Sequence, residues 1–296
     1  MGKTSIVSFL VITYNRKDYL SDTLRRILEQ DYQPIEVLIV DNNSTDGTDR
    51  VVKTSYNQPF IKYIRLSENV GVAKARNVAI KNATGHITIT LDDDALILGK
   101  DSTKKIVKKF ESDKKIGVLA FKIVNNSTGK ILTREFPHRN KSLDPDKEFE
   151  TTYFIGAGHA IRKEVFDKVG PYMNSFYGME ELDLSYRILD MGYKIIYFPE
   201  VTVIHKRTEK ARITEEWEHM LVNRMKMLYR NLPWRYVFTN MILWMGVALL
   251  KTKKLHILFT AFRNFLRDFE SIKHQRNVLR PETIRKIRDL KGRLYY

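Results

Sequence analysis

The sequence has no cysteine, no long apolar run and no glycine-rich phosphate-binding loop. Disulfides, zinc–thiolate sites and thiol nucleophiles are therefore excluded, which fits a reducing compartment. Because no stretch reaches about 18 uninterrupted apolar residues, we expect no transmembrane span, and the N-terminus lacks the pattern of a signal peptide. Neither Gly-x-Gly-x-x-Gly nor Gly-x-x-x-x-Gly-Lys-[Ser/Thr] is present, which disfavours dinucleotide cofactors and P-loop chemistry.

Positive charge is concentrated in the last third of the chain. Residues 206–296 contain 21 Lys or Arg and 8 Asp or Glu, so this segment carries +13 of the formal net charge of +16. An anionic membrane surface or nucleic acid would attract such a segment, and simple solubility is the plain alternative. We expect no nucleic-acid partner, because no recognisable nucleic-acid-binding module accompanies the charge.

Apolar runs and helical repeats alternate through the first hundred residues. This alternation predicts an α/β fold, in which a mostly parallel, Rossmann-like sheet is covered by helices on both faces. From apolar, β-branched runs we expect strands at 6–13, 35–40, 61–66, 87–91, 117–124, 195–198 and 201–204. From apolar spacing we expect helices after residue 16, after residue 48, and at 72–82, 104–110 and 178–191. Residues 135–150 are expected to be irregular.

The character of the chain changes near residues 206–213. We predict one domain over 1–210 and a basic, amphipathic helical region over 211–296. Residues 236–250 are apolar nearly all round, and the aromatic residues that follow lie beside Lys and Arg. Such a pattern suits a helix in a membrane interface. A helical subdomain packed on the core, or a homodimer contact, is the alternative.

Three adjacent acids, Asp92, Asp93 and Asp94, follow the strand expected at 87–91. Adjacent anions raise one another's pKa values and need a compensating cation. A divalent metal that carries a phosphorylated ligand would supply it, whereas an acidic turn before a helix is the plain alternative. Polar clusters also follow the first two strands, at 13–15 and 41–43. Since ligands bind at the carboxyl ends of parallel strands, we expect the three clusters to converge on one crevice.

The order and spacing of these segments resemble the inverting, nucleotide-sugar-dependent glycosyltransferases of family 2, which have the GT-A fold. The resemblance covers roughly residues 5–206, and within the family it is similar to polysaccharide and rhamnosyl-type transferases. The matching segments are Val-Ile-Thr-Tyr-Asn-Arg at 11–16, Asp-Asn-Asn-Ser-Thr-Asp-Gly-Thr at 41–48, Asn-Val-Gly-Val-Ala-Lys-Ala-Arg-Asn at 69–77, Leu-Asp-Asp-Asp at 91–94, Gly-Ala-Gly at 156–158, Glu-Glu-Leu-Asp-Leu-Ser-Tyr-Arg at 180–187 and His205.

The resemblance implies that the donor nucleotide contacts the ends of the first strands. The segment after the first strand would line the base, and a carboxylate after the second strand would accept the imide N–H of uracil or thymine. A plain turn between strand and helix is the alternative for 13–16. An arginine near the acidic triplet would hold an Asp or a phosphate. The nucleotide-binding residues predicted in this way are Thr13, Tyr14, Arg16, Asp41, Arg76, Asp92 and Asp93.

The resemblance also implies a metal-assisted transfer. Asp94 and His205 would bind Mg²⁺ or Mn²⁺, which would bridge to the two phosphates and assist the departing diphosphate. Glu181 would be the general base that activates the acceptor hydroxyl, although the family usually has Asp at this point. First-turn acids that favour the helix dipole are the alternative. The predicted sugar or acceptor contacts are Gly156, Gly158 and Glu180.

We therefore predict a soluble cytoplasmic glycosyltransferase, peripheral on the inner face of the cell membrane. It would move a sugar from a UDP or dTDP donor to a hydroxyl of a cell-surface glycan or a lipid-linked saccharide. One alternative is a sugar nucleotidyltransferase, which would need a basic, glycine-rich loop after the first strand. Another is a non-catalytic protein of the same fold that binds a nucleotide sugar or a membrane.

Overall fold

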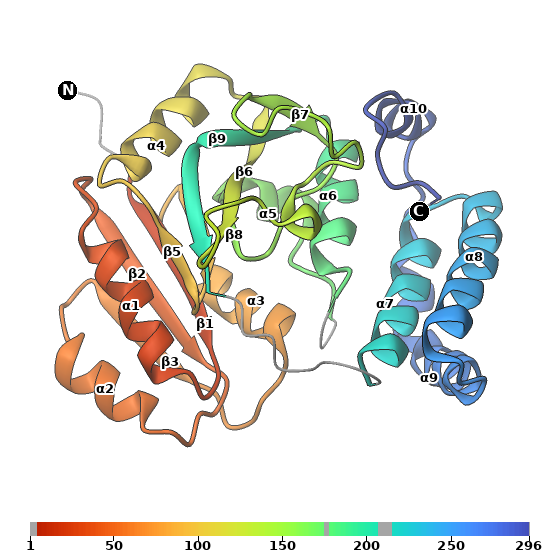
Figure 1. Cartoon of the computed structure of the whole chain (residues 1–296), viewed down its shortest axis with the longest axis horizontal. Helices are drawn as coiled ribbons and strands as arrows, with labels where there is room; N and C mark the ends of the chain where they lie inside the picture. The colour runs from red at the N-terminus through yellow and green to blue at the C-terminus, as the bar shows by residue number, and fades with distance from the viewer. Residues whose placement is uncertain (1–4, 175–177, 207–214, 296) are drawn as a thin grey trace.

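The fold is a sheet covered by helices on both faces, with a bundle of helices beside it (Figure 1). The structure, a computed structural model, describes residues 5–174, 178–206 and 215–295. Within these ranges nine strands form one sheet, in the order β3-β2-β1-β4-β8-β6-β9-β5, and β7 pairs with β9. The strands are β1 (Val7–Thr13), β2 (Ile35–Asp41), β3 (Ile61–Arg65), β4 (Ile87–Asp92), β5 (Ala95–Ile97), β6 (Ile116–Asn125), β7 (Phe149–Thr151), β8 (Gly158–Arg162) and β9 (Lys194–His205).

The sheet is mixed but mostly parallel. Strand β1 pairs in parallel with β2 and β4, β2 with β3, and β6 with β9, whereas β8, β5 and β7 pair antiparallel with their neighbours. The predicted fold class is therefore confirmed. The helices are α1 (Lys17–Leu28), α2 (Thr48–Ser55), α3 (Val72–Asn82), α4 (Ser102–Ser112), α5 (Lys163–Val169), α6 (Glu180–Asp190), α7 (Glu215–Asn231), α8 (Trp234–Thr252), α9 (His256–Ile272) and α10 (Pro281–Asp289).

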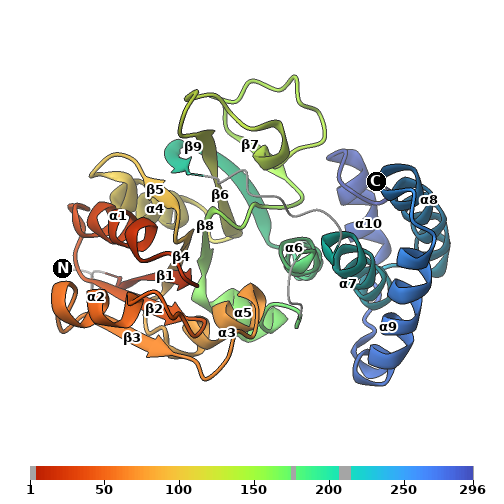
Figure 2. The same cartoon turned by 60° about the horizontal axis from the view of Figure 1, so that its bottom comes forward.

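Each face of the sheet has its own hydrophobic core. Because side chains alternate along a strand, Phe9 and Val11 of β1 pack on one side, and Leu10 and Ile12 on the other. Helices α1 and α4 cover the first side, and α3 and α5 cover the second (Figure 2). The strands of this doubly covered sheet are buried on both faces, which explains their continuous apolar runs.

The prediction of two strands at 195–198 and 201–204 was wrong, because both belong to the single strand β9. Its pairing with β6 shifts register, since Phe121 lies opposite Phe198 but Lys122 lies opposite Thr202. Such a bulge lets one strand carry the interrupting Pro199 and Glu200 without ending. The segment 135–150, which was expected to be irregular, contains the first residues of the short strand β7.

The C-terminal helices form a bundle that joins the sheet through α6. One buried cluster extends from the sheet side through Tyr186 of α6 to Leu228 of α7 and Ile287 of α10. The predicted helical C-terminal region is therefore confirmed. The expected boundary near 206–213 lies, apart from residue 206, outside the described residues, so the division into two domains stays a prediction. In the described part of the chain, no helix combines the length and apolarity that a membrane crossing requires.

Candidate active site

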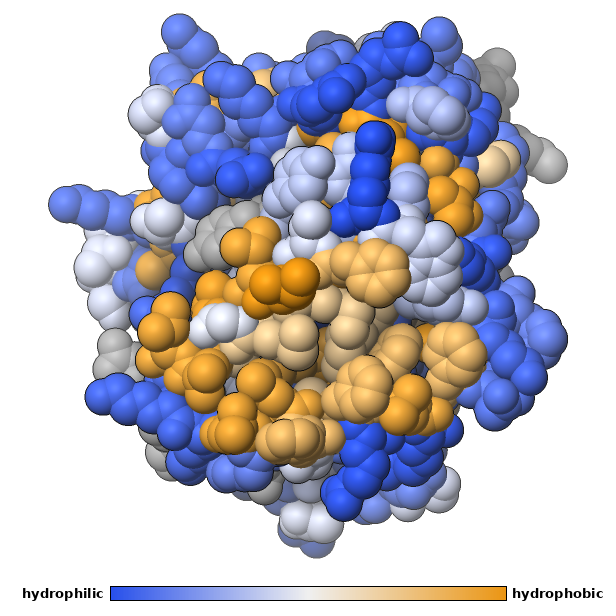
Figure 3. Space-filling model, turned by 90° about the vertical axis from the view of Figure 1, so that its right-hand side faces the viewer, coloured by the Kyte–Doolittle hydropathy of each residue, from blue (hydrophilic) through white to orange (hydrophobic). Residues whose placement is uncertain are grey.

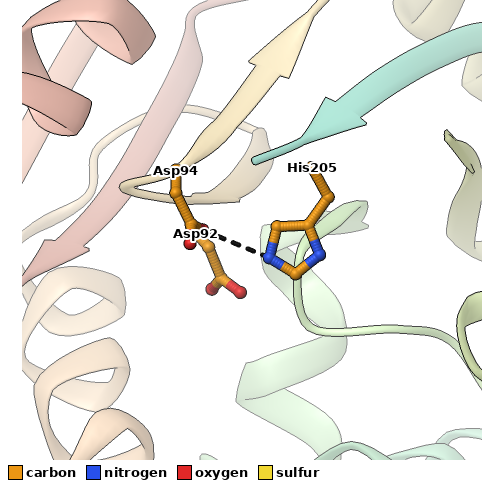
Figure 4. A group of neighbouring side chains, drawn as sticks. All are labelled: Asp92, Asp94 and His205. Atoms are coloured by element: carbon orange, nitrogen blue, oxygen red, sulfur yellow. Dashed lines mark ion pairs between the residues drawn. The ribbon is translucent and has the colours of Figure 1, made fainter. Parts of the chain in front are cut away.

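Two aspartates and a histidine meet where β4 and β9 end (Figure 4). The short strand β5 pairs with β9 so that Ala95 lies opposite His205, which brings the end of β9 beside the acidic triplet. His205 Nε2 lies 3.2 Å from Asp94 Oδ1. One ligand atom from each of Asp92, Asp94 and His205 falls within 4.8 Å of the other two. The family resemblance implied that Asp94 and His205 bind one metal ion; the structure brings the two side chains together, and the metal role stays a prediction.

A second carboxylate lies behind the histidine. His205 Nδ1 is 2.9 Å from Glu135 Oε1, and Glu135 Oε2 has no hydrogen-bond partner among the described residues. Burial would lower the pKa of His205, but the hydrogen bonds to Asp94 and Glu135 outweigh it and raise the pKa to about 10. The sequence analysis missed Glu135, because it lies in a segment without apolar periodicity and nothing in the sequence marks it.

The middle acid of the triplet is turned into the protein. Thr13 donates its hydroxyl hydrogen bond to Asp93 Oδ2 over 2.8 Å, and Arg16 Nη1 lies 3.2 Å from Asp93 Oδ1. Burial raises the pKa of Asp93 to about 7 in spite of Arg16. Arg16 Nη1 also lies 2.9 Å from Asp94 Oδ2. Thr13 and Arg16 thus contact the acidic triplet in this structure, whereas Tyr14, the third residue predicted here, is exposed to solvent at the end of β1.

Arg76 of α3 connects the acidic triplet with the start of α6. Its Nη2 lies 3.0 Å from Asp92 Oδ1, and its Nη1 lies 2.8 Å from Glu181 Oε1. Although burial would lower the pKa of this guanidinium, the charges of Glu181 and Asp92 raise it above its usual value. The backbone of Gly156 closes the arrangement, since its carbonyl accepts a hydrogen bond from Arg76 Nη2 over 3.3 Å. We expected Arg76 to hold Asp92 or a phosphate; the structure shows the contact with Asp92, and the role of Arg76 in nucleotide binding stays a prediction.

A side chain at position 156 would displace Glu181 and Arg76 from their contact, whereas position 158 is part of the sheet. A Cβ atom at Gly156 would collide with Glu181 Oε1 and lie 2.7 Å from Arg76 Nη2. Gly158 instead begins β8, where it pairs with Leu91, and its backbone packs on Val203. The structure therefore brings Gly156 into the site and leaves Gly158 in the sheet beneath it.

The two glutamates that begin α6 differ in their surroundings. The Glu180 side chain is 4% exposed and that of Glu181 is 20% exposed. Burial, followed by the charge of Glu181, raises the pKa of Glu180 to about 8, and Glu180 Oε2 has no hydrogen-bond partner among the described residues. Of the two, Glu181 has the exposure that a group in contact with substrate needs. Asp183, in contrast, is fully buried, and its Oδ2 pairs with Arg187 Nη2 at 2.8 Å, so its role is structural.

Asp41 lies at the end of β2, opposite Thr13 in the neighbouring strand. It is fully buried, and it accepts hydrogen bonds from the Ser44 N–H over 2.8 Å and from the Tyr63 hydroxyl over 2.5 Å. Tyr63 is a partner that the sequence analysis missed, because it comes from the separate strand β3. The predicted contact between Asp41 and a nucleotide base stays a prediction.

The donor set at the strand ends fits a divalent cation. One ligand atom from each of two carboxylates and one imidazole lies within 4.8 Å of the others, and Glu135 has an unpartnered oxygen behind them. Carboxylate oxygens are ligands that Mg²⁺ and Mn²⁺ prefer, and an imidazole is compatible with the softer of the two ions. The site could therefore neutralise a diphosphate through a bound metal ion.

Similarity to known proteins covers the sheet and most of these strand ends. The family model described as glycosyl transferase family 2 matches residues 8–170, more than half of the chain. The chain belongs to glycosyl transferase family 2. The resemblance predicted from the ordered motifs is therefore confirmed, and the glycosyltransferase class with it.

The chain is also similar to a curated polysaccharide synthase. It is 28% identical over 200 residues to the poly-beta-1,6-N-acetyl-D-glucosamine synthase of Staphylococcus aureus strain MSSA476, which covers 65% of this chain and 48% of that protein. The chain thus spans about half the length of this curated relative.

Solved structures share the fold. Mannosyltransferase PcManGT from Pyrobaculum calidifontis, in complex with GDP-Man and Mn2+, aligns with a TM-score of 0.59 at 23% identity, over 91% of this chain and 76% of that chain. S. aureus TarS 1–349, in complex with UDP-GlcNAc, aligns with a TM-score of 0.61 at 19% identity, over 88% and 80% of the two chains. At these identities the likeness shows the fold alone.

Proposed function

We propose that this family 2 glycosyltransferase is an inverting, metal-dependent enzyme. It transfers a sugar from a UDP or dTDP donor to a hydroxyl of a cell-surface glycan or a lipid-linked saccharide. The observation that carries the proposal is the convergence of Asp92, Asp94 and His205 where the strands end. Arg76 contacts Asp92 of this group and also Glu181. A metal site and a candidate base thus adjoin one another.

Asp94 and His205, together with Asp92, would hold the metal ion, and His205 would have to release the proton that its raised pKa retains. When bound, Mn²⁺ or Mg²⁺ would supply Lewis-acid assistance to the diphosphate leaving group. The imidazole in the donor set favours Mn²⁺, because Mg²⁺ prefers oxygen ligands. A structure of similar fold, PcManGT, contains Mn2+, which supports this choice.

Glu181 is the proposed general base. Arg76 holds its Oε1 oxygen at 2.8 Å, while no described residue hydrogen-bonds its Oε2 oxygen. The free oxygen would take the proton of the acceptor hydroxyl as that oxygen attacks the anomeric carbon. Attack from the side opposite the diphosphate inverts the anomeric configuration. Glu181 is one methylene longer than the family's usual Asp, and the fixed position of Oε1 limits where that longer chain can reach.

The nucleotide would lie across the ends of β1, β2 and β4. Tyr14 is exposed and would lie against a flat base. Asp41 would accept the imide N–H of uracil or thymine in place of the Tyr63 hydroxyl, which it binds in this structure. Asp92 would meet the ribose or the metal. UDP-N-acetylglucosamine is the first donor to test, since TarS was solved with UDP-GlcNAc and a sequence relative makes poly-N-acetylglucosamine.

A screen of nucleotide sugars with Mn²⁺ tests the proposal. We expect one UDP or dTDP sugar to raise the melting temperature in Mn²⁺ but not in EDTA, and to yield free nucleoside diphosphate on incubation. Release of pyrophosphate from a nucleoside triphosphate and a sugar phosphate would instead indicate a nucleotidyltransferase. Donor binding with no diphosphate release, with or without acceptors, would indicate a non-catalytic protein.

The protein is proposed to work in the cytoplasm, at the inner face of the cell membrane. The acceptor class supports this location, because a lipid-linked saccharide is held at a membrane.

A further inference from the structure

An apolar surface covers the outer sides of α8 and α9, at the end of the molecule farthest from α1 and α2 (Figures 1 and 3). The three most exposed of its side chains are Leu250, Phe259 and Ile242, which are 79%, 70% and 69% exposed. Together with Phe238, Leu255 and Leu266, they are called the apolar face below. Monomeric proteins rarely expose contiguous apolar patches of this kind without a function.

The apolar face follows helical spacing on both helices. On α8, Phe238 and Ile242 are four residues apart, and on α9, Phe259 and Leu266 are seven apart, so each pair lies along one side of its helix. The opposite sides are already used, because Ala248 of α8 and Ile257 and Ala261 of α9 are buried against α7. A surface helix that is packed on one side usually presents polar residues on the other. Helices α8 and α9 instead have a second apolar side, which is exposed to solvent.

Basic residues surround the apolar face. Residues 234–273 contain seven Lys or Arg and two acidic residues. Lys251, Lys253 and Lys254 lie at the exposed connection between α8 and α9, and Figure 3 shows hydrophilic residues bordering the apolar area. The partner of this surface must therefore be apolar and negatively charged. A symmetric second copy fits poorly, because a two-fold contact would bring the same lysines toward one another.

We propose that the apolar face docks on an anionic lipid bilayer. Helices α8 and α9 would lie in the plane of the interface, with phenylalanine and leucine side chains at the acyl boundary and the lysines against lipid phosphates. A pocket between α7, α8 and α9, lined by Met245, Leu258 and Phe262 among others, adds apolar surface in the same region. The proposal rests on no assumption about the donor, the metal or the base.

Flotation with liposomes tests the proposal on the full-length protein. We expect the protein to float with phosphatidylcholine vesicles that contain 30% phosphatidylglycerol, and not with phosphatidylcholine alone. The double variant Ile242→Ser/Phe259→Ser should bind the anionic vesicles at least tenfold more weakly. Met191→Ser is the matched control, because Met191 is 52% exposed but lies at the end of α6. Failure of the wild type to float, or equal flotation of the double variant, overturns the proposal.

A second variant pair tests the electrostatic part. Lys251→Gln/Lys254→Gln should weaken binding to the anionic vesicles on the order of thirtyfold. Each lysine near an anionic membrane surface raises the affinity about fivefold. Unchanged affinity would contradict the proposal. So would light scattering that shows a wild-type dimer which Ile242→Ser/Phe259→Ser converts to a monomer, because a second copy would then cover the face. Vesicle binding is measured without nucleotide and donor binding without vesicles, so failure of one proposal leaves the other standing.

Discussion

Carboxylates are buried at both ends of the parallel strands, one edge of the sheet being where the strands begin and the other where they end. Their surroundings differ between the two. At the edge where β2 begins, Glu36 accepts hydrogen bonds from the hydroxyls of Ser8 and Thr84 over 2.6 and 2.9 Å, and Lys62 Nζ lies 2.9 Å from its other oxygen. Burial alone would raise the pKa of Glu36, but these partners outweigh it and lower the pKa to about 2. Every oxygen of this carboxylate is satisfied.

Where the strands end, partners satisfy Asp41 and Asp94, but burial dominates at Asp93 and Glu180. It raises the pKa of Asp93 to about 7 and that of Glu180 to about 8. One oxygen of Glu180 and one of Glu135 lack hydrogen-bond partners among the described residues. Buried polar groups are normally paired, and groups with strongly shifted pKa values cluster at functional sites. The comparison teaches that the protein itself pairs the carboxylate where the strands begin. Where the strands end, it leaves carboxylate oxygens that a ligand can pair.

The sharpest test of this contrast is Glu181→Gln, for which we expect turnover to fall by roughly 10²–10⁴-fold. The amide keeps the size of the side chain but cannot take a proton. The affinity for the donor should be retained, and steady-state kinetics with calorimetry separates the two. Glu181→Asp, which restores the family's usual residue, should recover part of the rate. Wild-type turnover in Glu181→Gln would remove Glu181 as the base.

A somewhat smaller loss is expected for Asp94→Asn. Turnover should fall on the order of a hundredfold, because the variant loses an anionic ligand of the proposed metal ion. Mn²⁺-dependent binding of the nucleotide should weaken in parallel, as measured by calorimetry. Circular dichroism checks that the variant is folded, and Glu282→Gln, on the exposed first turn of α10, serves as a charge-matched control. Undiminished metal-dependent binding would contradict the metal role.

Substitution of Glu36, where β2 begins, should change the stability of the protein and leave its activity unchanged. Glu36→Gln should lower the free energy of unfolding by about 2 kcal/mol, because a paired, buried anion is replaced. The folded state holds the pKa of Glu36 below its ordinary value, so this contribution is present above about pH 4.5 and is lost as the pH falls toward 2. Denaturant titrations at pH 7 and pH 3 measure it. Loss of turnover per folded molecule would break the contrast between the edges.

The smallest effect is expected for Lys62→Ala. The Lys62 side chain is 46% exposed, so its ion pair with Glu36 contributes less than about 1 kcal/mol. The same denaturant titration should show this modest loss, and it should shrink further in high salt. A loss of stability as large as that in Glu36→Gln would mean that Lys62 is the main partner of the carboxylate. The hydroxyls, and the N–H groups of Thr84 and Gly85 that also donate to it, would then matter less.

Much of the fold could be predicted because β1, β2 and β4, which pair in parallel, are buried on both faces. Their apolar runs mark β1, β2 and β4 to within about a residue, and the acidic triplet follows the last of them. Where a strand is interrupted by a bulge, the local signal fails, as for β9. Strand β5 has only three residues and was not predicted at all.

The candidate site depended on contacts that no local pattern encodes. Arg76 and Glu181 are 105 residues apart in sequence, and their pairing follows from the packing of α3 and α6 on the same face of the sheet. The family resemblance proposed both residues, but not their contact. Glu135 had no signal, because it reaches His205 from a single 3₁₀ turn, Thr133–Glu135, in a segment without apolar periodicity. The structure shows Thr13 and Arg16 in contact with Asp93, which the sequence did not indicate, and their predicted contact with the base stays a prediction.

The central claim is that the edge where the strands end binds a divalent ion together with a nucleoside diphosphate. Calorimetric titration of UDP, dTDP and GDP into the full-length protein, with Mn²⁺ and then with EDTA, tests it most directly. We predict saturable heat for UDP or dTDP in Mn²⁺, its loss in EDTA and in Asp94→Asn, and its retention in Glu36→Gln. The absence of heat for every diphosphate in Mn²⁺, or equal heats for wild type and Asp94→Asn, would contradict the claim.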